Sequence, residues 1–138
     1  MADLNILDFY KDTAKVLIQL HRHFPRRSDV YVEDLIGADH TDEFGLHSKR
    51  HESCFAAILW LSEENYIRFQ STSRQEAINQ ATLTSRALIL LSTSDYPAST
   101  KKPTEITKID TRIEQLRDAI KSESSEQLAS TMRYFFEK

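Results

Sequence analysis

Glycine is scarce in this chain: only Gly37 and Gly45 occur among its 138 residues. A dinucleotide-binding Rossmann turn needs three glycines within one short loop, and a Walker A phosphate loop needs two glycines followed by Lys and Ser or Thr. Neither loop can be built from these residues. Folds with many strands also tend to use more turn glycines, so we expect helices to dominate.

Cysteine and long apolar runs are scarce as well. The single cysteine, Cys54, excludes an internal disulfide, which is typical of proteins from a reducing compartment. No apolar run approaches the roughly 20 residues that a membrane-spanning helix needs. The N-terminal MADLNILDFYKD has acidic residues among its apolar ones, unlike a signal peptide. We therefore expect a cytoplasmic protein without membrane association.

Catalytic motifs are also absent. The segment 51–55 (HESCF) lacks the second histidine of the zinc-protease motif, and no nucleophile elbow occurs. His47, His51 and Cys54 are spaced i, i+4 and i+7, so a helix would place three possible metal ligands on one face. Because Cys54 begins an apolar run, it is better interpreted as a small core residue. We predict no enzyme activity, no metal site and no cofactor.

Charge is distributed unevenly along the chain, whose formal net charge is −3. Residues 1–27 carry five basic and three acidic groups, whereas residues 28–47 carry six acidic groups and no Lys or Arg. An acidic chain is not a strong general binder of polyanions. Any contact with nucleic acid would therefore have to come from a local basic patch.

The spacing of apolar residues predicts three helices in the first half of the chain. Apolar residues recur at i+3 and i+4 over residues 4–23, and Pro25 ends this helix. A short second helix is expected over residues 30–36, where Gly37 stops it. The third helix is expected over residues 48–64. These lengths and breaks suit a helix-turn-helix unit.

The third expected helix has two different halves. Its first half is polar (SKRHES), whereas residues 54–61 (CFAAILWL) are apolar on every side and are expected to be largely buried. A helix with a buried C-terminal half and a projecting polar N-terminal half has the shape required to enter a DNA groove. Residues 66–70 then predict a strand, residues 71–78 a polar loop, residues 80–83 a second strand and residues 85–91 a helix.

Two stretches resemble known DNA-binding regulators. Residues 60–67 (WLSEENYI) resemble the end of a recognition helix passing into the first wing strand of MarR- or PadR-like bacterial regulators, and residues 81–88 (ATLTSRAL) resemble their second wing strand turning into the next helix. Where such proteins often have glycine, this chain has Asn65 and Ala87. The resemblance and the element order imply a mainly α-helical winged-helix domain over residues 1–92, with a small two-stranded β wing.

The remaining residues are expected to form a linker and a C-terminal helical extension. Residues 93–103 (TSDYPASTKKP) have the composition of a linker. In the segment 104–138, apolar residues repeat with spacings of three and four, the pattern of a coiled-coil seam. The seam residues are Ile106, Ile109, Ile113, Leu116 and Ile120. The seam predicts a homodimer interface, although two heptads can equally pack back on the first helix.

Double-stranded DNA is the first predicted partner. In this interpretation the N-terminal turn of the third helix reads the major groove, where Arg50 pairs with a guanine edge and Lys49 with phosphate. Basic residues before the second helix and in the wing would support the contact. The candidate DNA-binding residues are Arg26, Arg27, Ser48, Lys49, Arg50, His51, Ser53, Arg68 and Arg74. Two copies would then demand a near-palindromic site.

A protein partner is the alternative that the sequence leaves open. Winged helices also serve as protein-interaction modules. The acidic stretch 29–43 would then be the docking face for a basic partner, with no DNA bound. Its position beside the second helix, which usually lies near the DNA backbone, favours this alternative.

Overall fold

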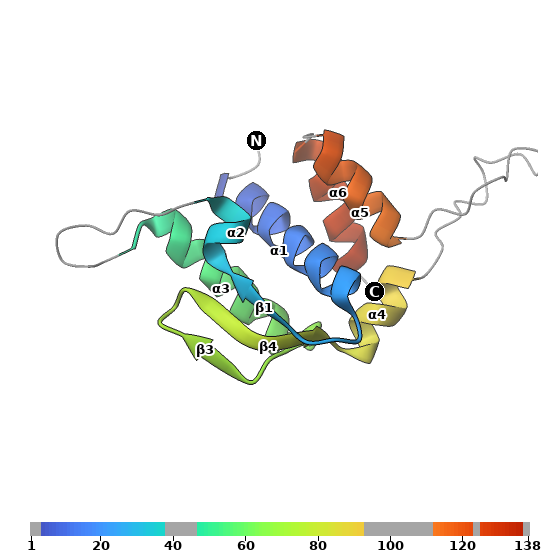
Figure 1. Ribbon diagram of the computed structural model, residues 1–138. Coiled ribbons are helices and arrows are strands. Elements are labelled where there is room, and N and C mark those ends of the chain that lie inside the picture. The colour runs from blue at the N-terminus through green and yellow to red at the C-terminus, as the bar shows by residue number, and fades with distance from the viewer. Residues whose placement is uncertain (1–3, 38–46, 93–111, 123–124, 137–138) are drawn as a thin grey trace, which may run out of the picture.

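The structure is a computed structural model that describes residues 4–37, 47–92, 112–122 and 125–136. Helices dominate it, and a small antiparallel sheet accompanies them (Figure 1). In chain order its elements are α1 (Leu4–His23), β1 (Ser28–Tyr31), α2 (Val32–Ile36), α3 (Lys49–Glu63), β2 (Ile67–Arg68), β3 (Ser71–Ser73), β4 (Ala77–Leu83), α4 (Ser85–Ser92), α5 (Arg112–Ser122) and α6 (Ser125–Phe136).

Helix α1 is the central element, because it packs against α3 and β4 on one side and against α5 and α6 on the other (Figure 1). Its bounds are those that the apolar periodicity predicts. Two polar residues, Asp12 and Thr13, are buried among its apolar ones. The Thr13 hydroxyl donates a hydrogen bond to the Phe9 carbonyl at 2.9 Å, which satisfies it inside the helix.

The sheet has four strands, so the expected two-stranded wing is too small. Strands β1, β4 and β2 lie side by side in that order, and β3 also pairs with β4. Residues 30 and 31 were expected to be helical, but they belong to β1, where Val30 faces Ile78 of β4. The expected loop 71–78 likewise contains β3 and the start of β4. Both predictions are wrong because strand pairing overrides local preference, with a distant segment for β1 and within a tight hairpin for β3.

The helix ends follow the local sequence closely. The Ser48 hydroxyl accepts a hydrogen bond from the His51 backbone N–H at 3.2 Å and caps α3, and Thr84 caps α4 by accepting from Ala87 at 3.2 Å. After α3, Asn65 adopts a left-handed backbone with φ 66°. Gly37, with φ 92°, ends α2. These caps confirm the predicted start of α3 and of α4.

The C-terminal helices complete the core of the same chain. On α5, Ile113 and Leu116 are buried, and Ile120 is half-buried. These helices pack on α1, on each other and, through α5, on α4. The described part of the predicted seam therefore contacts its own chain, which is the intramolecular alternative left open above. Ile106, Ile109 and the linker 93–103 lie outside the described residues.

An aromatic cluster joins α3 to α6. Tyr66, which is 2 % exposed, packs against Trp60, Phe135 and Phe136, with ring centroids 5.2–6.1 Å apart. Arg86 lies 4.4 Å from the centre of the Tyr66 ring and donates a hydrogen bond to the carbonyl of Glu64, the C-cap of α3, at 2.7 Å. These rings fill the core between the two helices.

Candidate functional site

The first turn of α3 is joined to the tip of the β3–β4 hairpin by two histidines. The Nε2–H of His51, a residue only 1 % exposed, donates to the Gln75 carbonyl at 2.9 Å. The ring of His47 stacks on that of His51, with centroids 3.7 Å apart, and its Nε2 lies 3.5 Å from the Glu76 carboxylate. The hairpin tip and the start of α3 are therefore held together as one unit.

The hairpin tip has a strained backbone. Arg74 and Gln75 have φ values of 48° and 61°, and the Glu76 N–H donates to the Ser73 carbonyl at 2.7 Å. Two left-handed residues inside such a hydrogen-bonded turn are characteristic of a type I′ turn, which usually carries Asn-Gly. Without glycine, each left-handed residue costs about 1–2 kcal/mol. Strand pairing and the His51 contact must offset this cost.

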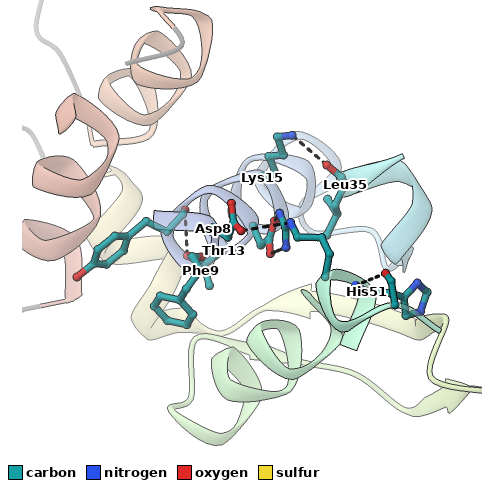
Figure 2. A network of polar contacts seen from close by, with 10 residues as sticks. Asp8, Phe9, Thr13, Lys15, Leu35 and His51 are labelled. Atoms are coloured by element: carbon teal, nitrogen blue, oxygen red, sulfur yellow. Dashed lines mark hydrogen bonds and ion pairs between the residues drawn. The ribbon is translucent and has the colours of Figure 1, made fainter. Parts of the chain in front are cut away.

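Arg50, the predicted reader of a guanine edge, is committed to α1. Its two terminal nitrogens each donate to one oxygen of Asp12 at 2.6 Å, and its Nε lies 3.6 Å from Asp8 (Figure 2). Asp12 is 1 % exposed, and its hydrogen bonds raise the pKa of the Arg50 guanidinium. Arg50 is half-buried, and its removal would leave the buried Asp12 carboxylate without its cation. Arg50 therefore holds α3 against α1.

A second polar contact fixes α2 to the same region. The Lys15 ammonium of α1 donates to the Leu35 carbonyl, near the end of α2, at 2.9 Å (Figure 2). A cation at a helix C-terminus also interacts favourably with the helix dipole. Through Lys15 and Asp12, α1 fixes the positions of both α2 and α3.

The structure divides the other predicted DNA-binding residues into two groups. Ser48, Lys49 and Ser53 are exposed on the first turns of α3, and Arg74 is exposed at the hairpin tip beside them. The remaining arginines, Arg26, Arg27 and Arg68, lie near the opposite end of β4. Arg68 is the register partner of Thr82, and Arg26 and Arg27 directly precede Ser28, the register partner of Ala81. His51 is buried and positions the hairpin.

A partly exposed stripe runs along α3 beside the hairpin tip: Glu52, Ala56 and Glu63 are exposed, Leu59 is half-buried and Phe55 is buried. Its residues recur at i, i+3, i+4, i+7 and i+11, so they share one side of the helix. They are Glu52, Phe55, Ala56, Leu59 and Glu63. We call this set the α3 stripe. With His51 and Gln75, its first four residues line an open pocket of about 350 Å³.

Residues 54–61 are largely buried, as the sequence predicts, and the exception lies in the α3 stripe. Ala56 is exposed, and Leu59 and Trp60 are half-buried, whereas Cys54, Phe55, Ala57, Ile58 and Leu61 are buried. The prediction is therefore confirmed for most of the segment, and Ala56 is exposed because α1, α2 and β2, which pack against α3, leave its side of the helix open. A helix that is apolar on every side needs a cover on every side, and this signal was available in the sequence.

The metal-ligand spacing at the start of α3 does not produce a cluster. Cys54 is fully buried and faces Asp12; burial, followed by the Asp12 charge, raises the pKa of its thiol to about 12. A thiol that stays protonated is a poor metal ligand. Across the described ranges, no three His, Cys, Asp or Glu side chains are grouped as a metal site requires.

Comparison with known proteins adds no further identification. No family model matches the chain, and no curated protein or solved structure matches it. Among the described residues, no helix is both long and apolar enough to span a bilayer. Function is therefore inferred from α3 and the hairpin tip themselves.

Proposed function

We propose that this chain is a protein-interaction module of the winged-helix type, which binds a protein partner through α3 and the β3–β4 hairpin tip. The element order supports the winged helix: helix, strand, helix, helix and then a hairpin, with the antiparallel strands ordered β1, β4, β2. In this plan, α3 occupies the position of a recognition helix.

The state of Arg50 carries the choice of a protein over DNA. With its guanidinium held by Asp12, α3 has one exposed cation, Lys49, against the exposed carboxylates of Glu52 and Glu63. DNA binding depends on neutralising phosphates with Lys and Arg, and carboxylates on the inserted helix oppose it. A helix that carries two acids and one base on its open side is poorly suited to a DNA groove.

The open side of α3 has the anatomy of a protein interface. Its centre is apolar, at the exposed Ala56 and the half-buried Leu59, and carboxylates stand at either end, with Lys49 one turn beyond Glu52. Protein interfaces have such an apolar centre and polar rim. The helix is also fixed before any partner arrives, by Asp12 on one side and the hairpin tip on the other, so little entropy is lost on binding.

Duplex binding in a salt series tests the proposal. We expect no binding of random or genomic duplex DNA beyond a weak background at about 50 mM salt, and no change with Lys49→Ala. The charge reversals Glu52→Lys and Glu63→Lys should instead create measurable, salt-sensitive DNA affinity, with Asp118→Lys on α5 as the control. Tight wild-type binding that falls steeply with salt and is lost in Lys49→Ala would contradict the proposal.

A homodimeric DNA-binding regulator is the second candidate, and the position of Arg74 favours it. This arginine is exposed at a hairpin tip that His51 holds beside Ser48, Lys49 and Ser53. A wing arginine in that position can enter a minor groove. This candidate predicts that Arg74→Ala weakens duplex binding and that light scattering finds a dimer of the full chain. A monomeric chain that does not bind duplex DNA would exclude this second candidate.

A further inference from the structure

The α3 stripe is about 16 Å long, and its apolar part from Phe55 to Leu59 spans about 6 Å, given a rise of 1.5 Å for each helical residue. Phe55, Ala56 and Leu59 form its middle, and Gln75 of the hairpin tip closes one side of the pocket above them. The pocket is open rather than enclosed. A small molecule needs most of its surface covered, so this shape suits a longer ligand that lies along the helix.

The two charges of the α3 stripe are negative, and the exposed Lys49 continues the same side of the helix beyond Glu52. Glu52 lines the pocket, and Glu63 follows Leu59 by one helical turn. Lys49 lies one turn before Glu52 and outside the pocket lining, and Arg86 near the end of α3 is already bonded to the Glu64 carbonyl and the Tyr66 hydroxyl. A ligand on the stripe therefore meets a carboxylate at each end of its apolar contact.

We propose, on the basis of the protein-interaction function above, that the α3 stripe binds a cationic amphipathic helix of a protein partner. Its apolar side chains, spaced i, i+3 or i+4, and i+7, lie over Phe55, Ala56 and Leu59. Its Lys or Arg residues, about 11 positions apart, pair with Glu52 and Glu63. Ridges of the same spacing on two helices interlock, which explains the preference for a helix over an extended segment.

A second copy of the chain is a poorer occupant of the same surface. Two copies related by a twofold axis present identical surfaces to each other. An antiparallel pair of α3 helices would then bring Glu52 of each copy toward Glu63 of its partner. Like charges at the rim of an interface disfavour association. The stripe therefore selects a partner of opposite charge over itself.

The experiment uses the full chain and two synthetic peptides of about 18 residues, long enough for about five helical turns. Both peptides carry Leu at i, i+3, i+4 and i+7; one carries Lys at both ends of that face and the other carries Glu. We expect the Lys peptide to bind in calorimetry, and its NMR shift changes to centre on Ala56, Leu59 and Gln75. The Glu peptide should bind at least about tenfold more weakly.

Two variants test whether the α3 stripe is the site. Ala56→Arg changes an exposed helical residue, so the fold should persist while a long cation fills the pocket; Lys-peptide affinity should fall by about tenfold or more. The double charge reversal Glu52→Lys and Glu63→Lys should reverse the order of the two affinities, so that the Glu peptide binds more tightly than the Lys peptide. Asp118→Lys on α5 is the matched control and should change neither affinity.

The outcomes separate this inference from the function on which it rests. Failure of the Lys peptide to bind, equal binding of both peptides, or self-association through α3 would overturn the cationic helix as the occupant. Lys-peptide binding with shifts centred away from the stripe, unaffected by Ala56→Arg, would overturn the site and leave a protein-interaction module intact. Specific duplex binding that the Lys peptide fails to displace would overturn the module itself.

Discussion

Lys49 and Arg50 are neighbours in sequence, yet they lie on different sides of α3 and have opposite fates. Arg50 faces α1, where two hydrogen bonds join it to the buried carboxylate of Asp12. Lys49 faces solvent. Successive helical residues point about 100° apart, so one residue of separation decides whether a cation is structural or available to a partner. The facing element, rather than the residue type, assigns the role.

The largest expected effect on the free energy of unfolding comes from removing the contact between Arg50 and α1. Arg50→Ala leaves the Asp12 carboxylate buried without its cation, and we expect the free energy of unfolding to fall by about 3–5 kcal/mol in urea denaturation. Lys49→Ala should change it by less than about 0.5 kcal/mol, because an exposed cation contributes little. Similar values for the two variants would mean that the Arg50–Asp12 pair does not hold α3 to α1.

A smaller effect is expected where α3 meets the hairpin. His51→Ala removes the donor to the Gln75 carbonyl and empties a buried position, which should destabilise the protein by about 1–3 kcal/mol. Hydrogen exchange at residues 74–76 should accelerate beyond that of the β1–β4 pairing, because the tip loses its anchor. Lys49→Ala again serves as the control. Uniform acceleration over the whole sheet would contradict an anchoring role.

Some of these features follow from the local sequence, and others depend on residues far apart along the chain. Helix α1, the caps at Ser48 and Thr84, and the left-handed Asn65 follow from short-range patterns, and the structure contains them. Strand β1 and the Arg50–Asp12 pair depend on residues 38 or more positions apart along the chain. No local pattern encodes such partners.

The α3 stripe lies between these two cases. Its helical spacing was readable from the sequence, since residues 54–61 are apolar on every side. Which side lacks a cover was not readable, because that depends on where α1 and the hairpin pack. Phe55 is buried and the adjacent Ala56 is exposed, a difference that depends on that packing.

The strain at the hairpin tip gives a third, stabilising prediction. Gln75→Gly removes a side chain from a left-handed residue and keeps the backbone carbonyl that His51 binds. Relief of about 1–2 kcal/mol is offset in part by the greater freedom of glycine in the unfolded chain. We expect a net gain of about 0.5–1 kcal/mol in denaturant unfolding. Gln80→Gly, at another left-handed residue with φ 57°, is a control distant from His51.

The last prediction compares two thiols at adjacent positions of α3, native Cys54 and the thiol introduced by Ser53→Cys. It has the smallest effect on stability at neutral pH. Cys54 is buried, and burial raises the pKa of its thiol from 9.0 to about 12. Its folded-state pKa therefore exceeds the unfolded value, so its contribution to stability is complete below pH 9 and is lost as pH rises from 9 toward 12.

At neutral pH, native Cys54 should react with a thiol reagent only as fast as the protein unfolds, because the thiolate is the reactive form. A thiol introduced by Ser53→Cys lies on the exposed side of the same helix and should react at the rate of a free thiol. Urea should accelerate only the Cys54 reaction. Fast labelling of Cys54 in the native protein would mean that α3 separates from α1 far more often than the Arg50–Asp12 pair allows.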